Sequence, residues 1–453
     1  MLERKAYSKL KAWKNRSQGK TALLVEGARR VGKSTLIRAF GESEYKSCLF
    51  IDFFQASDEV RSYFQDYRDD LDRLFLYLSA YYRVDLFERE TLIVFDEVQM
   101  FPLARGLVKY LVADGRYDYI ETGSLLSIRQ NVKDIVIPSE EEEMELNPLD
   151  FEEFLWGVGE QQLASLIRSQ FEAGKPLPDG LHRRAMGLLR EYMLVGGMPE
   201  PVSIYVDQHR FEPVDAAKRR IIELYRNDVA RFAAGYEFKV VSVLDGVPGQ
   251  LSRHEKRFKL SSLDKNARMR SYEEAFFWLA DARIANICYA SADPSVGLSL
   301  NMEQSSLKCY LADTGLLVSL AFADKSETEE GVYRSVLRGD IGLNEGMLVE
   351  NVVAQMLRAN GHKLFFYLQS GKREGEERME VDFLIVRPYA DAANKPRVCP
   401  IEVKSPRKYG TTSLERFKRK FGKRIGALYV LHPKQFEQKD GYTYLPLYMG
   451  FCL

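Results

Sequence analysis

Short apolar runs alternate with stretches of helical periodicity along the first part of the chain. The apolar runs have the length of buried strands and lie at residues 23–25, 48–54, 91–95 and 117–120. Apolar residues recur at helical spacing around them, at residues 1–17, 34–40, 57–88 and 103–113. Strands that alternate with helices in this way favour a mostly parallel sheet with helices on both faces. The fold class predicted for this part is therefore α/β.

The rest of the chain is less regular. Residues 139–145 form an acidic run, which we interpret as a solvated loop and not as an interaction site. Helical patterns fill residues 148–235, and residues 250–320 combine Lys- and Arg-rich helices with a short strand at 284–290. Residues 324–344 show no clear period, so we expect a linker there. A further α/β unit is expected to begin near residue 343.

Composition narrows the class of protein. The 453 residues include 65 Lys and Arg and 65 Asp and Glu, and a net charge of zero neither requires nor excludes a nucleic-acid partner. The five cysteines lie far apart without a C-x-x-C pair, which fits a reducing compartment. No stretch of about 18 apolar residues is present to span a bilayer. We therefore expect a cytoplasmic protein without a membrane partner.

The first apolar run leads into a phosphate-binding pattern. Gly27, Gly32, Lys33 and Ser34 fill every required position of G-x-x-x-x-G-K-[ST]. The glycines permit close backbone approach, and the amide groups of the loop and of the following helix would surround phosphate oxygens. Lys33 would meet the β- and γ-phosphates, and the Ser34 hydroxyl would ligate Mg²⁺. We predict an ATP-binding loop formed by Gly27, Ala28, Arg29, Arg30, Val31, Gly32, Lys33, Ser34 and Thr35.

Two acids follow the third apolar run. Asp96 and Glu97 would emerge at the carboxyl end of a buried strand, beside the phosphate loop. Asp96 is predicted to hold the Mg²⁺ shell, and Glu97 to orient and deprotonate the attacking water. The next strand ends in Thr122-Gly123-Ser124, so Thr122 and Ser124 are candidate sensors of the γ-phosphate, although such residues also simply end strands.

No arginine finger can be assigned from the sequence. Arg29 and Arg30 lie in the loop and would meet phosphate, solvent or a neighbouring subunit. Arg129, Arg226 and Arg231 are candidates by position alone.

The last third of the chain has a second constellation of charged residues. Glu350 lies within a helical pattern, Asp382 at the start of an apolar strand, and Glu402 two residues before Lys404 on the next strand. This order of elements is the arrangement of PD-(D/E)xK nucleases. Asp382 and Glu402 would hold a divalent metal, Mg²⁺ or Mn²⁺, through hard oxygen ligands, and Glu350 would complete the site. Lys404 would position or deprotonate water, or stabilise the developing charge.

There is an alternative interpretation of these predicted catalytic residues. They would be surface groups on a nuclease fold that has no cleavage activity. Charge favours a polyanion partner, because the chain from residue 345 onward has 19 Lys and Arg against 12 Asp and Glu, an excess of 7. Five of the basic residues cluster near one predicted helix, which could equally be a solvated helix: Lys418, Arg419, Lys420, Lys423 and Arg424.

Five motifs together resemble a known family. In order they are Gly-Ala-Arg-Arg-Val-Gly-Lys-Ser-Thr, Phe-Asp-Glu-Val-Gln, Thr-Gly-Ser, Pro-Leu-Asp-Phe-Glu-Glu-Phe and Gly-Gly-Met-Pro-Glu. The chain resembles the AAA-type (AAA+) P-loop ATPases of bacteria and archaea that have a C-terminal domain of unknown function. The resemblance implies an AAA+ core, helical and winged-helix-like segments, and a C-terminal α/β domain with a restriction-endonuclease-like fold. The corresponding parts are an ATPase core at 1–150, a helical lid-like region at 151–235, a winged-helix-like region at 236–325 and a nuclease-like domain at 343–453.

The sequence therefore predicts a Mg²⁺-dependent ATPase whose nucleotide state controls a nuclease-like domain on nucleic acid, DNA more than RNA. The alternative is a nucleotide-dependent regulatory or scaffold protein with an inactive nuclease fold. A homo-oligomer is left open.

Overall fold

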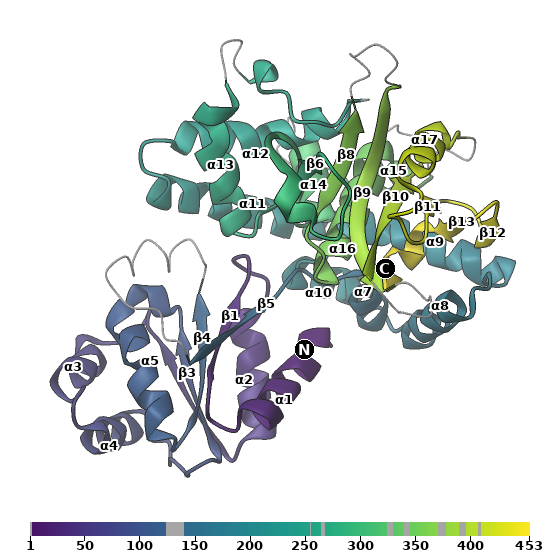
Figure 1. The fold of residues 1–453 in the computed structure, drawn as a ribbon. Coiled ribbons are helices and arrows are strands. Elements are labelled where there is room, and N and C mark those ends of the chain that lie inside the picture. Colours follow the sequence, from purple (N-terminus) through teal and green to yellow (C-terminus); the bar gives the residue numbers. More distant parts are fainter. Residues whose placement is uncertain are drawn as a thin grey trace. The chain divides into compact units, whose positions relative to one another are not determined.

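The structure is a computed structural model of the chain, and it describes residues 2–453 except 124–139, 254, 264–267, 324–328, 339–344, 370–376, 389–395 and 406–408. The described residues form two compact units. We call Glu3–Asn147 the N-terminal unit and Pro148–Leu453 the C-terminal unit. In Figure 1 the colours run from purple to blue in the first and from blue-green to yellow in the second.

The N-terminal unit is built on a five-stranded sheet in the order β2-β3-β4-β1-β5, with all neighbouring strands parallel. Its strands are β1 (Ala22–Glu26), β2 (Ser47–Asp52), β3 (Thr91–Asp96), β4 (Asp118–Gly123) and β5 (Glu141–Glu145). Strand β4 lies between β1, which leads into the phosphate loop, and β3, which ends at Asp96. Because parallel strands end at one edge of the sheet, these three strand ends meet there. The predicted parallel α/β core is confirmed.

Helices cover both faces of this sheet. They are α1 (Lys5–Ser17), α2 (Lys33–Glu44), α3 (Asp58–Asp66), α4 (Leu71–Tyr82) and α5 (Pro102–Asp114), with the 3-10 turn η1 (Val98–Met100). Figure 1 shows α1 and α2 on one side and α3, α4 and α5 on the other. Four fully or nearly fully buried rings, Phe53, Phe64, Phe95 and Phe101, pack against one another on the second side.

The acidic run at 139–145 is not a solvated loop, because Glu141–Glu145 forms the edge strand β5. It pairs in parallel with β1, from Ala22 opposite Glu141 to Glu26 opposite Glu145. Glu141 forms an ion pair of 2.8 Å with the buried Arg105 of α5. Tertiary pairing overrides the weak strand propensity of glutamate here.

The C-terminal unit begins with helices. They are α7 (Phe151–Gly157), α8 (Gln161–Ala173), α9 (Asp179–Val195), α10 (Pro199–Gln208), α11 (Phe211–Phe232), α12 (Glu237–Leu251) and α13 (Met269–Asp281). Later helices are α14 (Thr314–Ala321), α15 (Glu330–Arg338), α16 (Glu345–Ala359) and α17 (Thr412–Phe421), and 3-10 turns are η2 (Leu260–Ser262), η3 (Leu298–Asn301) and η4 (Leu447–Cys452). The helical expectation for 148–235 is met, and the winged-helix assignment further on stays a prediction.

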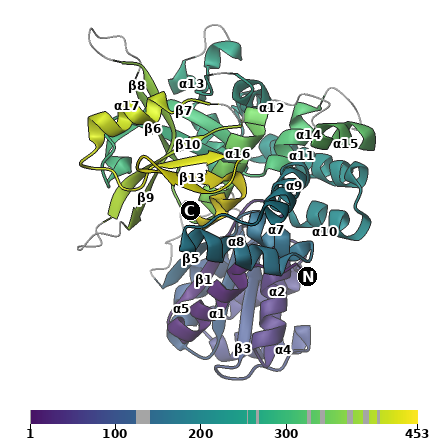
Figure 2. The same cartoon turned by 90° about the vertical axis from the view of Figure 1, so that its right-hand side faces the viewer.

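An eight-stranded mixed sheet in the order β12-β13-β11-β10-β9-β8-β6-β7 organises this unit. Its strands are β6 (Ala285–Ser291), β7 (Met302–Leu311), β8 (Phe365–Gln369), β9 (Met379–Pro388), β10 (Pro396–Val403), β11 (Tyr429–His432), β12 (Glu437–Lys439) and β13 (Tyr442–Pro446). The antiparallel hairpin β6–β7 joins the sheet through parallel pairing of β6 with β8. Helices α16 and α17 lie on opposite faces (Figure 2). The hairpin from the middle of the sequence thus extends the C-terminal sheet.

Part of the expected linker at 324–344 is helical. Residues Glu330–Arg338 form α15, and its Tyr333 is fully buried. The Tyr333 hydroxyl donates a hydrogen bond of 2.6 Å to Asp215 of α11. Within the described residues, this segment is therefore packed and not a linker. Helix α15 has only nine residues, so its amphipathic pattern is too short to be recognised in the sequence.

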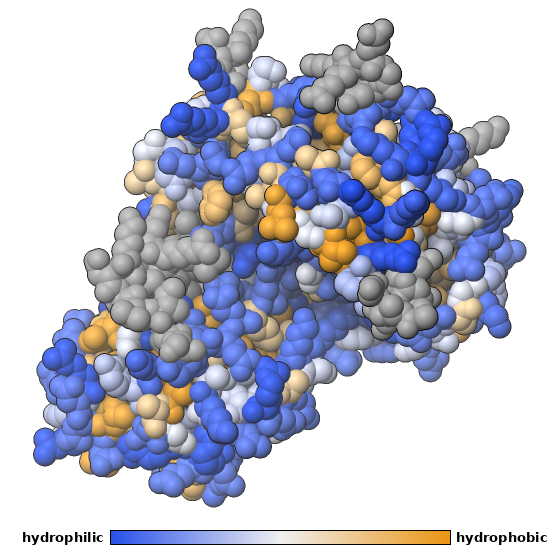
Figure 3. Space-filling model, in the orientation of Figure 1, coloured by the Kyte–Doolittle hydropathy of each residue, from blue (hydrophilic) through white to orange (hydrophobic). Residues whose placement is uncertain are grey.

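The surface drawn in Figure 3 is mostly hydrophilic, with scattered apolar spots. Exposed large apolar side chains of the N-terminal unit include Phe54, Leu76 and Tyr110. Among the described residues, no helix has both the length and the apolar character needed to cross a bilayer.

Two of the recognised motifs meet inside the C-terminal unit. Leu149, in Pro-Leu-Asp-Phe, donates its amide to Gly197 O at 2.7 Å and accepts a bond of 2.6 Å from the Tyr192 hydroxyl. A β-carbon on Gly197 would lie 2.0 Å from Leu149 O. Gly196 has a positive φ of 87° and faces Asp313, which caps α14. These glycines are therefore required by backbone packing.

We expect Gly197→Ala to lower the free energy of unfolding by about 3 kcal/mol or more, because the new methyl group overlaps a backbone oxygen. Gly187→Ala is the matched control, since Gly187 lies in α9 with nothing near its position for a β-carbon. The control should gain about 0.5–1 kcal/mol from helix propensity. Chemical denaturation followed by circular dichroism measures both, and equal effects of the two substitutions would contradict this account.

Candidate functional site

The phosphate loop joins β1 to α2 at the carboxyl edge of the N-terminal sheet. Its backbone turns through left-handed conformations at Arg30, with φ 68°, and at Gly32, with φ 95°. A β-carbon on Gly27 would lie 2.4 Å from Leu146 O, so only glycine fits between the loop and the end of β5. Helix α2 then begins at Lys33, which places its free amide groups at the loop.

Lys33 is the buried cation of this loop. Its ammonium donates hydrogen bonds to Gly27 O at 2.9 Å and Ala28 O at 3.2 Å. Burial lowers the pKa of Lys33, and the carboxylates of Glu97 and Asp96 partly oppose that effect. A buried ammonium held only by carbonyls gains from an anion, and a nucleotide phosphate would supply one.

Asp96 connects three elements of the site. Its Oδ1 accepts hydrogen bonds from the Ser34 hydroxyl of α2, at 2.9 Å, and from the Thr122 hydroxyl of β4. Burial raises the pKa of Asp96, the two hydroxyls oppose this, and the nearby Glu97 and Asp52 add to it. A buried carboxylate beside a serine hydroxyl is a set of hard oxygen donors that fits Mg²⁺. The residues predicted as Mg²⁺ ligands, Ser34 and Asp96, are thus brought together.

Glu97 follows Asp96 in a left-handed conformation, with φ 53°. Its amide donates to the Thr122 hydroxyl at 3.2 Å, and its carboxylate accepts from the Gln99 side chain. Thr122 therefore fixes the positions of both acids. Strain of this kind in a non-glycine residue is a feature of functional sites.

Sequence reasoning missed two residues of this site. Asp52 ends β2 directly opposite Asp96 in the sheet register, and its carboxylate accepts from Phe54 N at 2.9 Å. Arg4, with 7% of its surface exposed, donates to Val31 O at 3.2 Å and to Asn147 O at 2.6 Å. The sequence carried no signal for this role, because the partners of Arg4 lie 27 and 143 positions away and its burial is visible only in the structure.

The remaining candidates give no arginine or sensor contact that can be assigned to the nucleotide. Arg29 and Arg30 have exposed side chains, while Ser124 and Arg129 lie outside the described residues. Arg226 pairs with Asp245 at 3.0 Å within the C-terminal unit, and Arg231 stacks on Phe232 of its own helix. No arginine finger is assigned.

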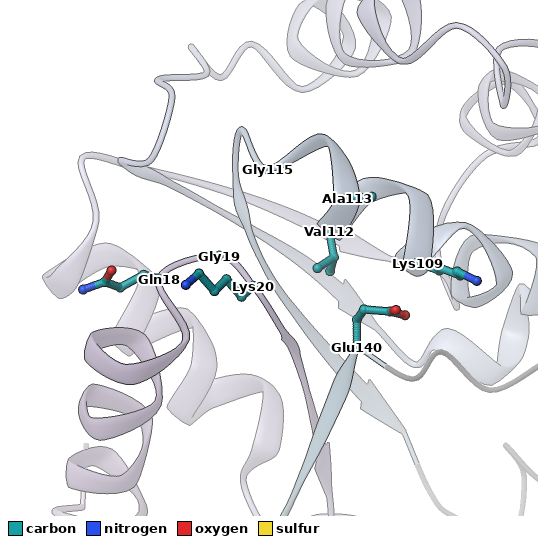
Figure 4. Close-up of a pocket in the computed structure, with 8 residues that line it drawn as sticks. All are labelled: Gln18, Gly19, Lys20, Lys109, Val112, Ala113, Gly115 and Glu140. Atoms are coloured by element: carbon teal, nitrogen blue, oxygen red, sulfur yellow. The ribbon is translucent and has the colours of Figure 1, made fainter.

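A pocket of about 330 Å³ lies elsewhere in the N-terminal unit (Figure 4). Three of the residues that line it show where it lies. Gly19 precedes β1, Val112 is in the last turn of α5, and Glu140 precedes β5. It therefore lies near the amino ends of the strands, at the sheet edge opposite the phosphate loop. The pocket is not the nucleotide site.

In the C-terminal unit, the predicted acids gather on the face of the sheet covered by α16. Glu350 of α16 accepts a bond of 2.9 Å from the Tyr310 hydroxyl of β7 and forms an ion pair with Lys256. Asp382 of β9 accepts from Val403 N at 2.9 Å. Glu402 of β10 forms an ion pair of 2.6 Å with Lys404.

A lysine that sequence reasoning missed lies among these acids. The Lys308 ammonium is 2.8 Å from Glu380, 3.5 Å from Asp382 and 4.0 Å from Glu350, and its side chain is 1% exposed. Burial opposes its charge, but the three carboxylates outweigh burial and raise the pKa of Lys308 well above its ordinary value. The signal in the sequence is a lysine within the otherwise apolar stretch Leu307-Lys308-Cys309-Tyr310, since a lysine that is buried there needs partners.

Lys256 is a second lysine that pairs with these acids. It lies in the Lys- and Arg-rich part of the sequence at 250–320, yet it is largely buried and bonded to Glu350 and to Gly346 O. Burial raises the pKa of Glu350, as does Asp382, while Lys308 and Lys256 lower it. Burial and Asp382 raise the pKa of Glu402 to about 7, against the effect of Lys404.

These residues do not fit the divalent metal predicted at Asp382 and Glu402. Ammonium and amide donors already bond to oxygens of Glu350, Asp382 and Glu402. Among the described residues, no group of three His, Cys, Asp or Glu side chains is arranged to hold a metal ion. The structure therefore brings the four predicted residues near one another but surrounds them with lysines.

The basic cluster of the C-terminal unit lies on α17 and just after it. Four of its members have partners: Arg419 pairs with Glu377, Arg424 pairs with Asp293, Lys418 donates to Asp440 O, and Lys420 donates to Gln369 and Tyr367. The two ion pairs are exposed, so each is weak and could yield to a phosphate. The cluster remains a candidate polyanion surface.

Three family models match the chain. Residues 19–155 match the AAA domain, residues 186–327 match a domain of unknown function (DUF8612), and residues 345–449 match another (DUF4143). The AAA part of the resemblance is thus confirmed, and the nuclease-like and winged-helix parts stay predictions. A search of curated proteins finds no match.

Solved structures give only distant likenesses. The Orc1 protein of Aeropyrum pernix in complex with DNA is 12% identical, with a TM-score of 0.28 over 72% of this chain and 93% of that one. Cdc6p of Pyrobaculum aerophilum is 11% identical, with a TM-score of 0.26 over 76% of this chain and 96% of that one. These scores are too low to support an inference about this chain.

We expect Ser34→Ala to weaken the binding of Mg²⁺-ATP roughly tenfold, because a hard oxygen donor beside Asp96 is lost. The affinity for ATP in excess EDTA should stay unchanged. Titration with a fluorescent ATP analogue measures both, with exposed Ser8→Ala of α1 as the matched control. Equal losses with and without Mg²⁺ would show that Ser34 does not act through the metal.

Proposed function

We propose that the chain is an ATP-hydrolysing switch in which the N-terminal unit binds Mg²⁺-ATP and its nucleotide state controls the C-terminal unit. The C-terminal unit binds nucleic acid, DNA more than RNA, and does not cleave it. The observation that supports the first part is the Asp96 carboxylate, which is bonded to Ser34 of the loop helix and Thr122 of β4. The match to the AAA domain supports the same conclusion.

The residues at the carboxyl edge of the N-terminal sheet would have distinct roles in phosphoryl transfer. On binding, Lys33 would leave Gly27 O and Ala28 O for the β- and γ-phosphate oxygens. Glu97 would accept a proton from the attacking water, and Thr122 would hold Glu97 in place. Mg²⁺ at Ser34 and Asp96 would neutralise charge on the phosphates.

The exit from the N-terminal unit supports control of the second unit by nucleotide. The chain passes to the C-terminal unit at Asn147–Pro148. Leu146 N donates to Glu26 O at 2.7 Å, at the start of the phosphate loop, and Arg4 bonds both Val31 O and Asn147 O. A change in the loop on phosphate binding would therefore act on the segment that leads to the second unit.

Two properties of the C-terminal unit support binding without cleavage. Its last 109 residues, 345–453, have an excess of 7 basic groups, and Lys423 and Arg424 are exposed after α17. Its predicted catalytic acids are paired with lysines, which argues against a metal-dependent cut. The alternative of metal-dependent cleavage at Glu350, Asp382, Glu402 and Lys404 is therefore less favoured.

Hydrolysis should depend on Lys33 and Glu97. We expect Lys33→Ala to lose ATP binding, and Glu97→Gln to bind ATP normally but hydrolyse it at least about 100-fold more slowly, because the base is gone. Phosphate release and ATP binding are measured on the same samples. The matched control is Glu88→Gln, an exposed acid of the same unit. Undiminished hydrolysis in Glu97→Gln would remove Glu97 from the mechanism.

Arg4 is predicted to position the loop. We expect Arg4→Ala to raise the KM for ATP roughly tenfold with a smaller change in kcat, since charge-assisted bonds to Val31 O and Asn147 O are lost. Arg4→Lys should recover part of the affinity, and exposed Lys9→Ala should change neither constant. A KM that is the same in Arg4→Ala and wild type would contradict this role.

A further inference from the structure

The acidic cluster of the C-terminal unit holds its own cations. Its four carboxylates belong to Glu350, Glu380, Asp382 and Glu402, and its three ammonium groups to Lys256, Lys308 and Lys404. Buried carboxylates repel one another and lose hydration, so such a group needs nearby positive charge. In this cluster, side chains of the same chain supply it.

Lys308 is the central cation. It enters from β7, which is separated from β9 in the sheet by β6 and β8. Its ammonium lies 5.1 Å from the ring centroid of Phe366 in β8, so the side chain extends along the sheet face toward β9. There it reaches Glu380 and Asp382 of β9 and approaches Glu350 of α16.

We propose that Lys308 is the resident cation of this cluster, in the place that the sequence assigns to a divalent metal. A metal ion would have to displace a buried ammonium from its carboxylates, and that ammonium would then lack partners. The cluster is therefore closed to divalent cations and joins the β6–β7 hairpin to α16 and β9. This inference goes beyond the proposed function, and its test requires neither ATP nor nucleic acid.

The neighbours of Lys308 agree with a permanent occupant. Tyr310, two residues along β7, lies on the same face and donates to Glu350. Lys256 occupies the other oxygen of Glu350. Among the described residues, Glu402 Oε2 is the cluster oxygen that is buried without a hydrogen-bond partner, while Lys404 is paired with Oε1 of the same carboxylate.

The test compares the full-length protein with Lys308→Ala and Lys308→Met. Both variants remove the charge, but only alanine opens space between the carboxylates. We expect both to have a lower Tm than wild type in EDTA. Mn²⁺ should raise the Tm of Lys308→Ala by about 5 °C or more, and change that of wild type and Lys308→Met by less than about 1 °C.

Two controls make the result specific. Adding Asp382→Asn to Lys308→Ala should abolish the gain with Mn²⁺, and exposed Lys363→Ala should behave as wild type. If Lys308→Ala gains nothing from Mn²⁺, the proposal that Lys308 takes the place of a metal is overturned.

Wild-type protein provides a second measurement that does not depend on a variant folding. Calorimetric titration of wild type and Asp382→Asn with Mn²⁺ should give the same heats, because Asp382 is already paired with Lys308. Binding in wild type that is lost in Asp382→Asn would overturn the proposal.

Discussion

The bonding of one buried carboxylate sets the geometry of the N-terminal site. Asp96 lies at the end of β3 and is held by hydroxyls from α2 and β4. Strand β4 is the direct neighbour of β3 in the sheet, so Thr122 at its end lies next to Asp96. The Thr122 hydroxyl also accepts a hydrogen bond from the amide of Glu97. Burial opposes the charge of Asp96, so a cation at this position would be stabilised. We propose that this is where Mg²⁺ binds, beside the loop in which Lys33 would bind phosphate.

Both units contain buried carboxylates, but the two units differ in what balances the negative charge. In the N-terminal unit, the buried Asp96 carboxylate accepts hydrogen bonds from two hydroxyls and lies near a second acid, so a bound cation would stabilise it. In the C-terminal unit, Lys308 and Lys256 meet that need from within the chain. The first arrangement leaves room for a bound ligand to change its charge balance, whereas the cations of the second are side chains of the same chain. This contrast is consistent with a nucleotide-driven unit acting on a binding unit.

Local patterns in the sequence were sufficient for the phosphate loop, for the placement of Asp96 and Glu97 at a strand end, and for four of the five strands of the N-terminal sheet. Thr122 could be placed because a strand end next to the loop follows from parallel order. Features that depend on distant pairing could not be found. Arg4 bonds residues 27 and 143 positions away, and β5 is a glutamate run whose strand pairing comes from β1. Lys308 belongs to β7, a strand that the sequence pattern did not predict. Without Lys308, the remaining acids of the cluster were interpreted as ligands of a metal ion.

The central claim is that nucleotide state at the phosphate loop controls the C-terminal unit. The most direct measurement is the affinity of the wild-type chain for a labelled DNA duplex, by fluorescence anisotropy at one fixed salt concentration. It would be made with Mg²⁺-ADP and with a non-hydrolysable Mg²⁺-ATP analogue. The account predicts that the two dissociation constants differ by about fivefold or more, as expected for coupled sites. Tight DNA binding that is identical in both nucleotide states, or no DNA binding in either, would contradict it.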